Sequence, residues 1–168
     1  RIARKIDVRR HGSGRTGGTN VWRSAGFPAA LLTAIFDALK GTAAVAVARW
    51  AGLSPWGQAL AGTFAIVGHN YSIFLGFDGG AGTATSVGAI AALWLPSLPI
   101  VVLSGTAAGL LVGHASVASI VVALMLPLLH LLTGSVPYAV GFGLPAMTLT
   151  LWALRPNIQR LFNGEERF

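Results

Sequence analysis

Long apolar runs, separated by short polar or glycine-rich connections, leave this chain few folds to adopt. Only 10% of its 168 residues are charged and 54% are hydrophobic, whereas an ordinary soluble domain carries about 25% charged residues. A helix satisfies its backbone hydrogen bonds internally, so an apolar helix can lie in lipid. We therefore predict an all-α, polytopic membrane helix bundle that forms a single domain over residues 1–168.

The apolar runs predict six membrane spans in this chain, at residues 27–50, 56–71, 84–98, 99–112, 117–132 and 136–154. Several are shorter than the ~20 residues of a full span, so we expect some helices to bend or some boundaries to shift. The chain begins at Arg1 instead of Met, and we expect a preceding N-terminal segment to have been removed.

The basic residues gather at the two ends of the chain. Residues 1–26 hold seven of the twelve Lys and Arg residues, and residues 155–168 hold three more. Because basic segments stay on the cytoplasmic side, both ends should be cytoplasmic. A basic tail could instead bind nucleic acid, but the apolar runs beside it favour the lipid bilayer as the partner. With six spans, residues 1–26, 72–83, 113–116 and 155–168 share one face.

Two of these segments, residues 11–20 and 76–85, are dense in glycine. Glycine allows backbone N–H groups to approach an anion closely, which predicts a phosphorylated substrate at this face of the membrane. Residues 12–17 also match G-x-G-x-x-G, but a dinucleotide site needs a buried strand before it. The preceding segment is basic and polar, so we reject that interpretation.

Other catalytic classes find little support. Asp37 and Lys40 lie three residues apart in an apolar helix, where they either pair or line a polar interior, and both alternatives stay open. Cysteine is absent, and no second metal-ligating residue lies at ligand spacing from any of the four histidines (His11, His69, His114 and His130), so no metal site or cofactor is predicted. No G-x-S-x-G elbow is present, which disfavours a serine hydrolase.

A set of motifs follows in order over nearly the whole chain. The first segments are Ile6-Asp7-Val8-Arg9, Gly12-Ser13-Gly14 to Arg23, and Asp37-x-x-Lys40-Gly41. They continue with Gly68-His69 to Thr85, Ser116-Val117-Ala118-Ser119, and Asn157-Ile158-x-Arg160 to Glu166. This ordered set resembles the bacterial acyl-phosphate:glycerol-3-phosphate acyltransferases (PlsY). The family has seven spans, so the resemblance implies that this chain lacks the first.

The resemblance implies transfer of a fatty acyl group from acyl phosphate to the sn-1 hydroxyl of glycerol 3-phosphate. The resemblance also implies that this reaction takes place at the cytoplasmic face, without a metal or a covalent acyl-enzyme. For the oligomeric state, we favour a monomer. The residues implied as catalytic are Ser13, Asn20, Arg23 and His69. Those implied in substrate binding are Gly12, Gly14, Arg15, Gly17, Gly79, Gly80, Gly82, Ser116 and Asn157.

The second glycine segment departs from the family at two cations. The family has Lys-Gly-Gly-Lys-Gly where this chain has Asp78-Gly79-Gly80-Ala81-Gly82. Arg15 stands where the family usually has asparagine, so one hypothesis is that Arg15 restores the lost cation and the enzyme works. The alternatives are a divergent paralogue that is non-catalytic or altered in substrate, or a small membrane carrier that binds phosphate or lipid.

Overall fold

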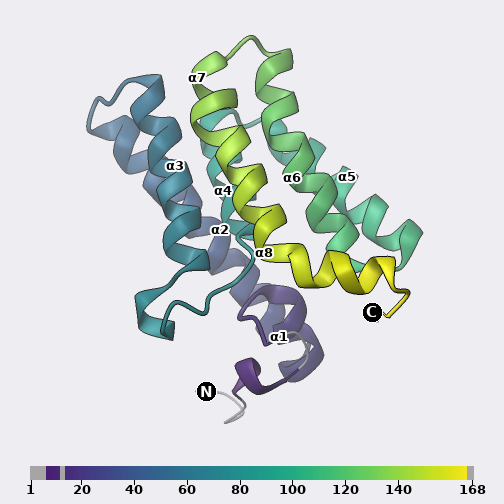
Figure 1. The fold of residues 1–168 in the computed structure, drawn as a ribbon. Coiled ribbons are helices and arrows are strands. Elements are labelled where there is room, and N and C mark those ends of the chain that lie inside the picture. Colours follow the sequence, from purple (N-terminus) through teal and green to yellow (C-terminus); the bar gives the residue numbers. More distant parts are fainter. Residues whose placement is uncertain (1–6, 12–13, 166–168) are drawn as a thin grey trace.

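The computed structural model describes residues 7–11 and 14–165, and every regular element in these residues is helical. Figure 1 shows a bundle of long helices with shorter elements at its lower end. The elements in chain order are η1 (Val8–Arg10), α1 (Gly18–Ala25), α2 (Phe27–Trp50), α3 (Pro55–Asn70), η2 (Ile73–Leu75), α4 (Thr83–Leu93), α5 (Ser97–Val112), α6 (Ala115–Leu132), α7 (Val136–Tyr138), η3 (Ala139–Gly143) and α8 (Leu144–Phe162).

Small residues allow the central helices to pack closely. Helix α4 packs along α2, while α6 packs against both α5 and α8. At Gly88 of α4, a β-carbon would overlap the backbone carbonyl of Ala38 in α2. Small residues of this kind let helix backbones approach one another in lipid, where hydrophobic burial does not drive association. Val45, Ile90 and Phe142 are among the fully buried side chains of the core that results.

The helices confirm most of the predicted apolar runs, with three differences in extent. A short helix, α1, occupies residues that we expected to be loop, and Gly26 with φ of +88° separates it from α2. Helix α4 ends at Leu93 instead of residue 98. Pro96 follows, and the helical conformation is disfavoured for the residue that precedes a proline. Helix α8 continues to Phe162, beyond the predicted end at residue 154.

The outside of the bundle is apolar. Among the described residues, three helical stretches have the length and hydropathy to cross a membrane: Phe27–Trp50, Ala115–Leu132 and Val136–Phe162. Helices α4 and α5 are apolar but shorter. The count of six spans therefore stays a prediction. Many large apolar side chains of these helices are exposed, the reverse of a soluble surface.

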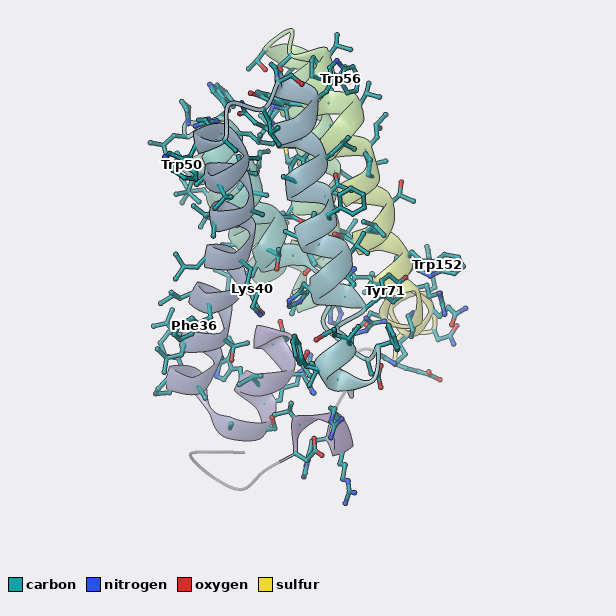
Figure 2. The ribbon with its side chains drawn as sticks, turned by 90° about the vertical axis from the view of Figure 1, so that its left-hand side faces the viewer. Phe36, Lys40, Trp50, Trp56, Tyr71 and Trp152 are labelled. Atoms are coloured by element: carbon teal, nitrogen blue, oxygen red, sulfur yellow. The ribbon has the colours of Figure 1, made fainter. Side chains whose placement is uncertain are left out.

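Aromatic side chains lie at two levels along the bundle. In Figure 2, Trp50 and Trp56 lie toward the upper end, whereas Tyr71 and Trp152 lie lower, near the level of Lys40. Tryptophan and tyrosine are enriched where lipid meets water, but the exposed Phe36 of α2 lies below the lower of these two levels (Figure 2). Helix α1, the connection between α3 and α4, and the last turns of α8 all gather at the lower end (Figure 1).

Candidate functional site

A cavity of about 380 Å³ opens at the lower end of the bundle, and we call it the main cavity. Both glycine segments contribute to it, although they lie more than fifty residues apart in the sequence. The predicted site residues in its lining are Arg15, Gly17, Asn20, Arg23, His69, Gly82, Ser116 and Asn157. The predicted convergence of the four polar segments on one face is thus confirmed.

The first glycine segment is held from the inside by Asn20. Its buried Nδ2 donates hydrogen bonds to the backbone carbonyls of Val8 (2.8 Å), His11 (3.0 Å) and Arg15 (2.8 Å). One amide group therefore fixes the path of the chain before and after residues 12–13. Asn20 also lines the main cavity, but its Nδ2 is already occupied by these carbonyls.

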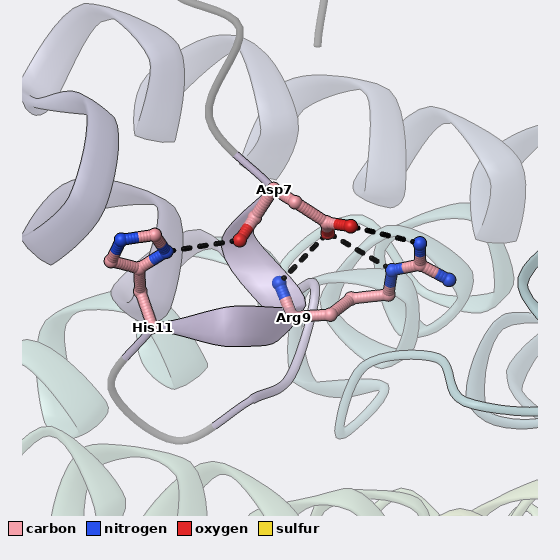
Figure 3. A network of polar contacts seen from close by, with 3 residues as sticks. All are labelled: Asp7, Arg9 and His11. Carbon is pink, nitrogen blue, oxygen red and sulfur yellow. Dashed lines mark hydrogen bonds and ion pairs between the residues drawn. The ribbon is translucent and has the colours of Figure 1, made fainter.

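A second polar network stiffens the start of the described chain (Figure 3). Asp7 caps η1 by accepting a hydrogen bond from the backbone N–H of Arg9 at 3.2 Å. The same carboxylate accepts from Nε and a terminal nitrogen of the Arg9 guanidinium, both at 3.0 Å. His11 Nδ1 lies 3.0 Å from the backbone oxygen of Asp7. These contacts hold η1 as a compact unit beneath α1.

The second glycine segment packs down on the C-terminal end of α3. The backbone N–H of Gly79 donates to the carbonyl of Asn70 at 3.1 Å. At Gly80, a β-carbon would overlap Nε2 of the His69 ring, so only glycine fits there. Gly82 has φ of +84° and begins α4. Gly79 and Gly80 are buried by this packing and do not line the main cavity.

Arg15 joins the two glycine segments. Its guanidinium donates a hydrogen bond to the carbonyl of Gly80 at 3.3 Å, across 65 residues of sequence. Burial lowers the pKa of Arg15 from its ordinary value, while the negative charge of Asp78 acts in the opposite direction. A guanidinium that is partly removed from water next to a cavity favours an anionic ligand.

Asp37, Lys40 and His69 form a cluster beside the cavity. Lys40 Nζ donates to Asp37 Oδ1 at 2.7 Å, and His69 Nδ1 lies 3.4 Å from the same oxygen. The side chains of Asp37 and His69 are each only 7% exposed, and both residues line the main cavity. The two alternatives for Asp37 were pairing with Lys40 and lining a polar interior. Both are present together, because Asp37 pairs with Lys40 and also orients a residue of the cavity wall.

First-turn residues of several helices face the main cavity. They are Gly18 and Thr19 of α1, Thr83 and Ala84 of α4, and Ala115 and Ser116 of α6. The first N–H groups of a helix have no partner within that helix, and the helix dipole makes this end positive. Together with Arg15 and Arg23, these helix starts have the chemistry that suits an oxyanion.

Helices α6 and α8 supply further polar groups. Ser116 and Ser119 lie three residues apart on one face of α6, and both line the cavity. Helix α8 contains Pro156 and turns sharply in its last part (Figure 1). A proline inside a helix removes a hydrogen bond and kinks it. The kink brings Asn157, one residue later, to the cavity.

The lining of the main cavity is apolar in part. Trp22, Phe27 and Leu31 line it, and all three are also exposed on the outside of the bundle. The Trp22 and Phe27 rings meet edge to face with centroids 5.8 Å apart. The cavity therefore continues into a surface fit for lipid.

Not every predicted site residue can be placed. Gly12 and Ser13 lie outside the described residues, and Gly14 does not line the main cavity. The sequence interpretation missed Ser119 and the first turn of α1. The spacing of the two serines of α6 was a signal for Ser119. Within residues 7–11 and 14–165, no group of three or more His, Cys, Asp or Glu side chains could hold a metal ion.

Comparisons with known proteins agree on one family. The family model described as glycerol-3-phosphate acyltransferase matches residues 1–164. A glycerol-3-phosphate acyltransferase of Thermus thermophilus is 40% identical over 96% of this chain and 81% of its own length. Glycerol-3-phosphate acyltransferase 1 of Deinococcus radiodurans is 43% identical over 98% of this chain and 83% of its own length.

Two solved structures share the fold, both of PlsY, an integral membrane glycerol 3-phosphate acyltransferase. The glycerol 3-phosphate form has a TM-score of 0.88 and 31% identity, covering 98% of this chain and 83% of that one. The lysophosphatidic acid form has a TM-score of 0.76 and 32% identity, covering 94% of this chain and 81% of that one.

Proposed function

The chain belongs to the glycerol-3-phosphate acyltransferase family, and on this premise we propose that it transfers a fatty acyl group from acyl phosphate to the sn-1 hydroxyl of glycerol 3-phosphate. The products are lysophosphatidic acid and inorganic phosphate. The observation that carries the proposal is a single cavity lined both by cationic and polar side chains and by apolar ones. Such a cavity suits a phosphate group attached to a fatty acyl chain.

The chemistry needs positioning and charge neutralisation more than a strong nucleophile on the protein. The substrate hydroxyl oxygen forms a bond to the acyl carbonyl carbon, and the bond from that carbon to the phosphate oxygen breaks. The hydroxyl proton passes to phosphate. Arg15, Arg23 and the first-turn amides stabilise the leaving phosphate, while Ser116 and Asn157 hold glycerol 3-phosphate in reach. Ser13, as the family resemblance implies, belongs to the same cradle.

The cluster of Asp37, Lys40 and His69 stabilises the second glycine segment. Asp37 fixes the His69 ring, and the ring packs on Gly80, whose carbonyl accepts the hydrogen bond from Arg15. His69 therefore acts as a positioning residue for the second glycine segment. The acyl chain lies along Trp22, Phe27 and Leu31, where the cavity wall meets the lipid-facing surface.

The location that we propose is the bacterial inner membrane, with the main cavity at the cytoplasmic face. The distribution of basic residues supports this orientation, because both ends of the chain are rich in arginine. The polar segments of both ends contribute to the cavity.

Phosphate release tests the activity. Purified protein in bilayer discs should release phosphate from acyl phosphate only when glycerol 3-phosphate is also present, and each turnover should yield one lysophosphatidic acid. Saturable binding of either substrate with no product would contradict the proposal. That result would favour the non-catalytic paralogue or the carrier.

A further inference from the structure

A second, smaller cavity of about 110 Å³ lies on the other side of Arg15, and we call it the side cavity. Arg15 lines both cavities, whereas Arg155 lines only the side cavity. The remaining lining residues are Asn70, Tyr71, Phe77, Asp78, Gly79, Trp152 and Ala153. None of the steps proposed above uses this space.

The polar groups of the side cavity suit an oxyanion. Arg15 and Arg155 bring two positive charges against the single negative charge of Asp78. The Arg155 guanidinium carbon lies 4.2 Å from the centroid of a Trp152 ring, a cation–π contact that restricts its orientation. Planar guanidinium groups bind phosphate through paired hydrogen bonds.

Asn70 adds an independent observation. It is only 6% exposed, and neither Nδ2 nor Oδ1 has a hydrogen-bond partner among the described residues. A buried amide without partners is costly, so such groups nearly always meet a ligand or water. Both amide atoms are themselves shut off from solvent, and Oδ1 lies beside Gly82, so Asn70 meets a ligand of the side cavity only if its side chain turns.

Exposed aromatic side chains line the side cavity. Tyr71 and Trp152 are 42% and 59% exposed, respectively, and Figure 2 shows them close to each other. Phe77, also in the lining, is exposed as well. Aromatic rings and arginine side chains at a membrane interface surround lipid headgroups. Basic pockets between helices on the cytoplasmic side of membrane proteins bind anionic headgroups.

We propose that the side cavity binds the phosphate of an anionic phospholipid headgroup, held by Arg155 and Arg15. Free inorganic phosphate shares the ligand chemistry, but the exposed aromatic side chains in the lining favour the lipid. Because both cavities share Arg15, an anion in the side cavity weakens the attraction of the main cavity for phosphate. Bound anionic lipid therefore raises the KM for glycerol 3-phosphate, a consequence that rests on the proposed function.

Native mass spectrometry of the protein tests the binding site directly. Phosphatidylglycerol should bind more tightly than phosphatidylcholine. Arg155→Gln should weaken phosphatidylglycerol binding about 10- to 100-fold, the range expected for one charge-assisted contact. Arg10→Gln is the matched control, because it removes the same charge from an exposed residue that lines neither cavity, and it should leave binding unchanged. Equal effects of the two variants, or none, would overturn the proposal.

A variant that should strengthen lipid binding distinguishes the loss of a contact from the loss of folding. Asp78→Asn removes the negative charge from the side cavity and should tighten phosphatidylglycerol binding, which misfolding cannot do. Weaker binding in this variant would contradict the proposal. Inorganic phosphate, added at the lipid's concentration, should not displace it. Displacement would overturn the assignment to a lipid.

Kinetics in bilayer discs test the coupling. Replacing part of the phosphatidylcholine by phosphatidylglycerol should raise the KM for glycerol 3-phosphate. Part of this rise comes from the negative membrane surface and remains in both variants. The part from the side cavity should disappear in Arg155→Gln and persist in Arg10→Gln, and equal rises would overturn the coupling. A protein that binds the lipid through Arg155 but has no turnover would refute the proposed function and leave this site intact.

Discussion

The charge of Arg15, more than its hydrogen bond, should determine the rate of acyl transfer. Arg15 lines the main cavity and ties the glycine segments through the Gly80 carbonyl. A lost charge-assisted contact to phosphate costs about 1.5–3 kcal/mol, which corresponds to a fall in kcat/KM of roughly one to two decades. Arg15→Gln keeps a side-chain N–H that can donate to Gly80, whereas Arg15→Ala removes both functions.

The assay is phosphate release at matched concentrations of folded protein. If charge is what matters, Arg15→Gln and Arg15→Ala should lose activity to the same extent. Activity retained in Arg15→Gln and lost in Arg15→Ala would assign Arg15 a role in loop structure alone. An unchanged rate in both variants would refute the reasoning and rule out compensation for the lysine missing at Ala81.

A lysine at position 15 should make the rate of acyl transfer depend on pH. Burial lowers the pKa of Arg15, but the ordinary pKa of arginine lies so far above neutral that the guanidinium stays charged near neutral pH. A lysine begins at about 10.4, and the same burial would lower its pKa toward the range of the assay. Arg15→Lys should therefore lose activity as the pH rises, while the unaltered protein does not. Parallel pH profiles of the two proteins would contradict this.

Three further substitutions test the packing and the polar wall. Gly88→Ala should lower the stability by about 1–3 kcal/mol, because its β-carbon overlaps a carbonyl of α2, whereas Gly68→Ala meets no atom within 4 Å and should be neutral in a thermal unfolding assay. Asp37→Asn should lower both the unfolding temperature and kcat, since Lys40 loses its partner and His69 its orientation; an unaltered kcat would remove His69 from the positioning role. Ser116→Ala should raise the KM for glycerol 3-phosphate about fivefold or more, as expected for one hydrogen bond, and a changed kcat at constant KM would argue against substrate binding.

The helices could be predicted because their cause is local. The run from Phe27 to Trp50 has the bounds of α2, and α3, α4, α5 and α6 start within two residues of the predicted positions. The last predicted span begins with α7 at Val136, and α8 itself begins only at Leu144. The predicted ends of two helices were wrong, and both lie near a proline, which can either end a helix or bend it. Pro96 ends α4 before the predicted boundary, while Pro156 lies inside α8 and only bends it. The outcome depends on whether packing around the kink compensates for the lost hydrogen bond, and no local pattern reports that.

The roles of the glycines and of Asn20 could not be derived from composition. The glycines of the second segment were expected to present amides to an anion, yet Gly80 is required because the His69 ring occupies the space of a side chain. Asn20 was assigned to catalysis, and its Nδ2 holds three backbone carbonyls of the first segment. These roles are contacts between segments far apart in the chain, so spacing alone does not reveal them.

By itself, the sequence determined that this chain is a membrane helix bundle whose polar segments meet at one face. The reason is that hydropathy and charge act on each segment separately, through its transfer into lipid. Only the tertiary structure decided that Asp37 orients His69, that Arg15 bridges the glycine segments, and that the same guanidinium lies between two cavities. Those relations depend on how closely helices approach, and small residues such as Gly88 set that approach through contacts made only in the folded bundle.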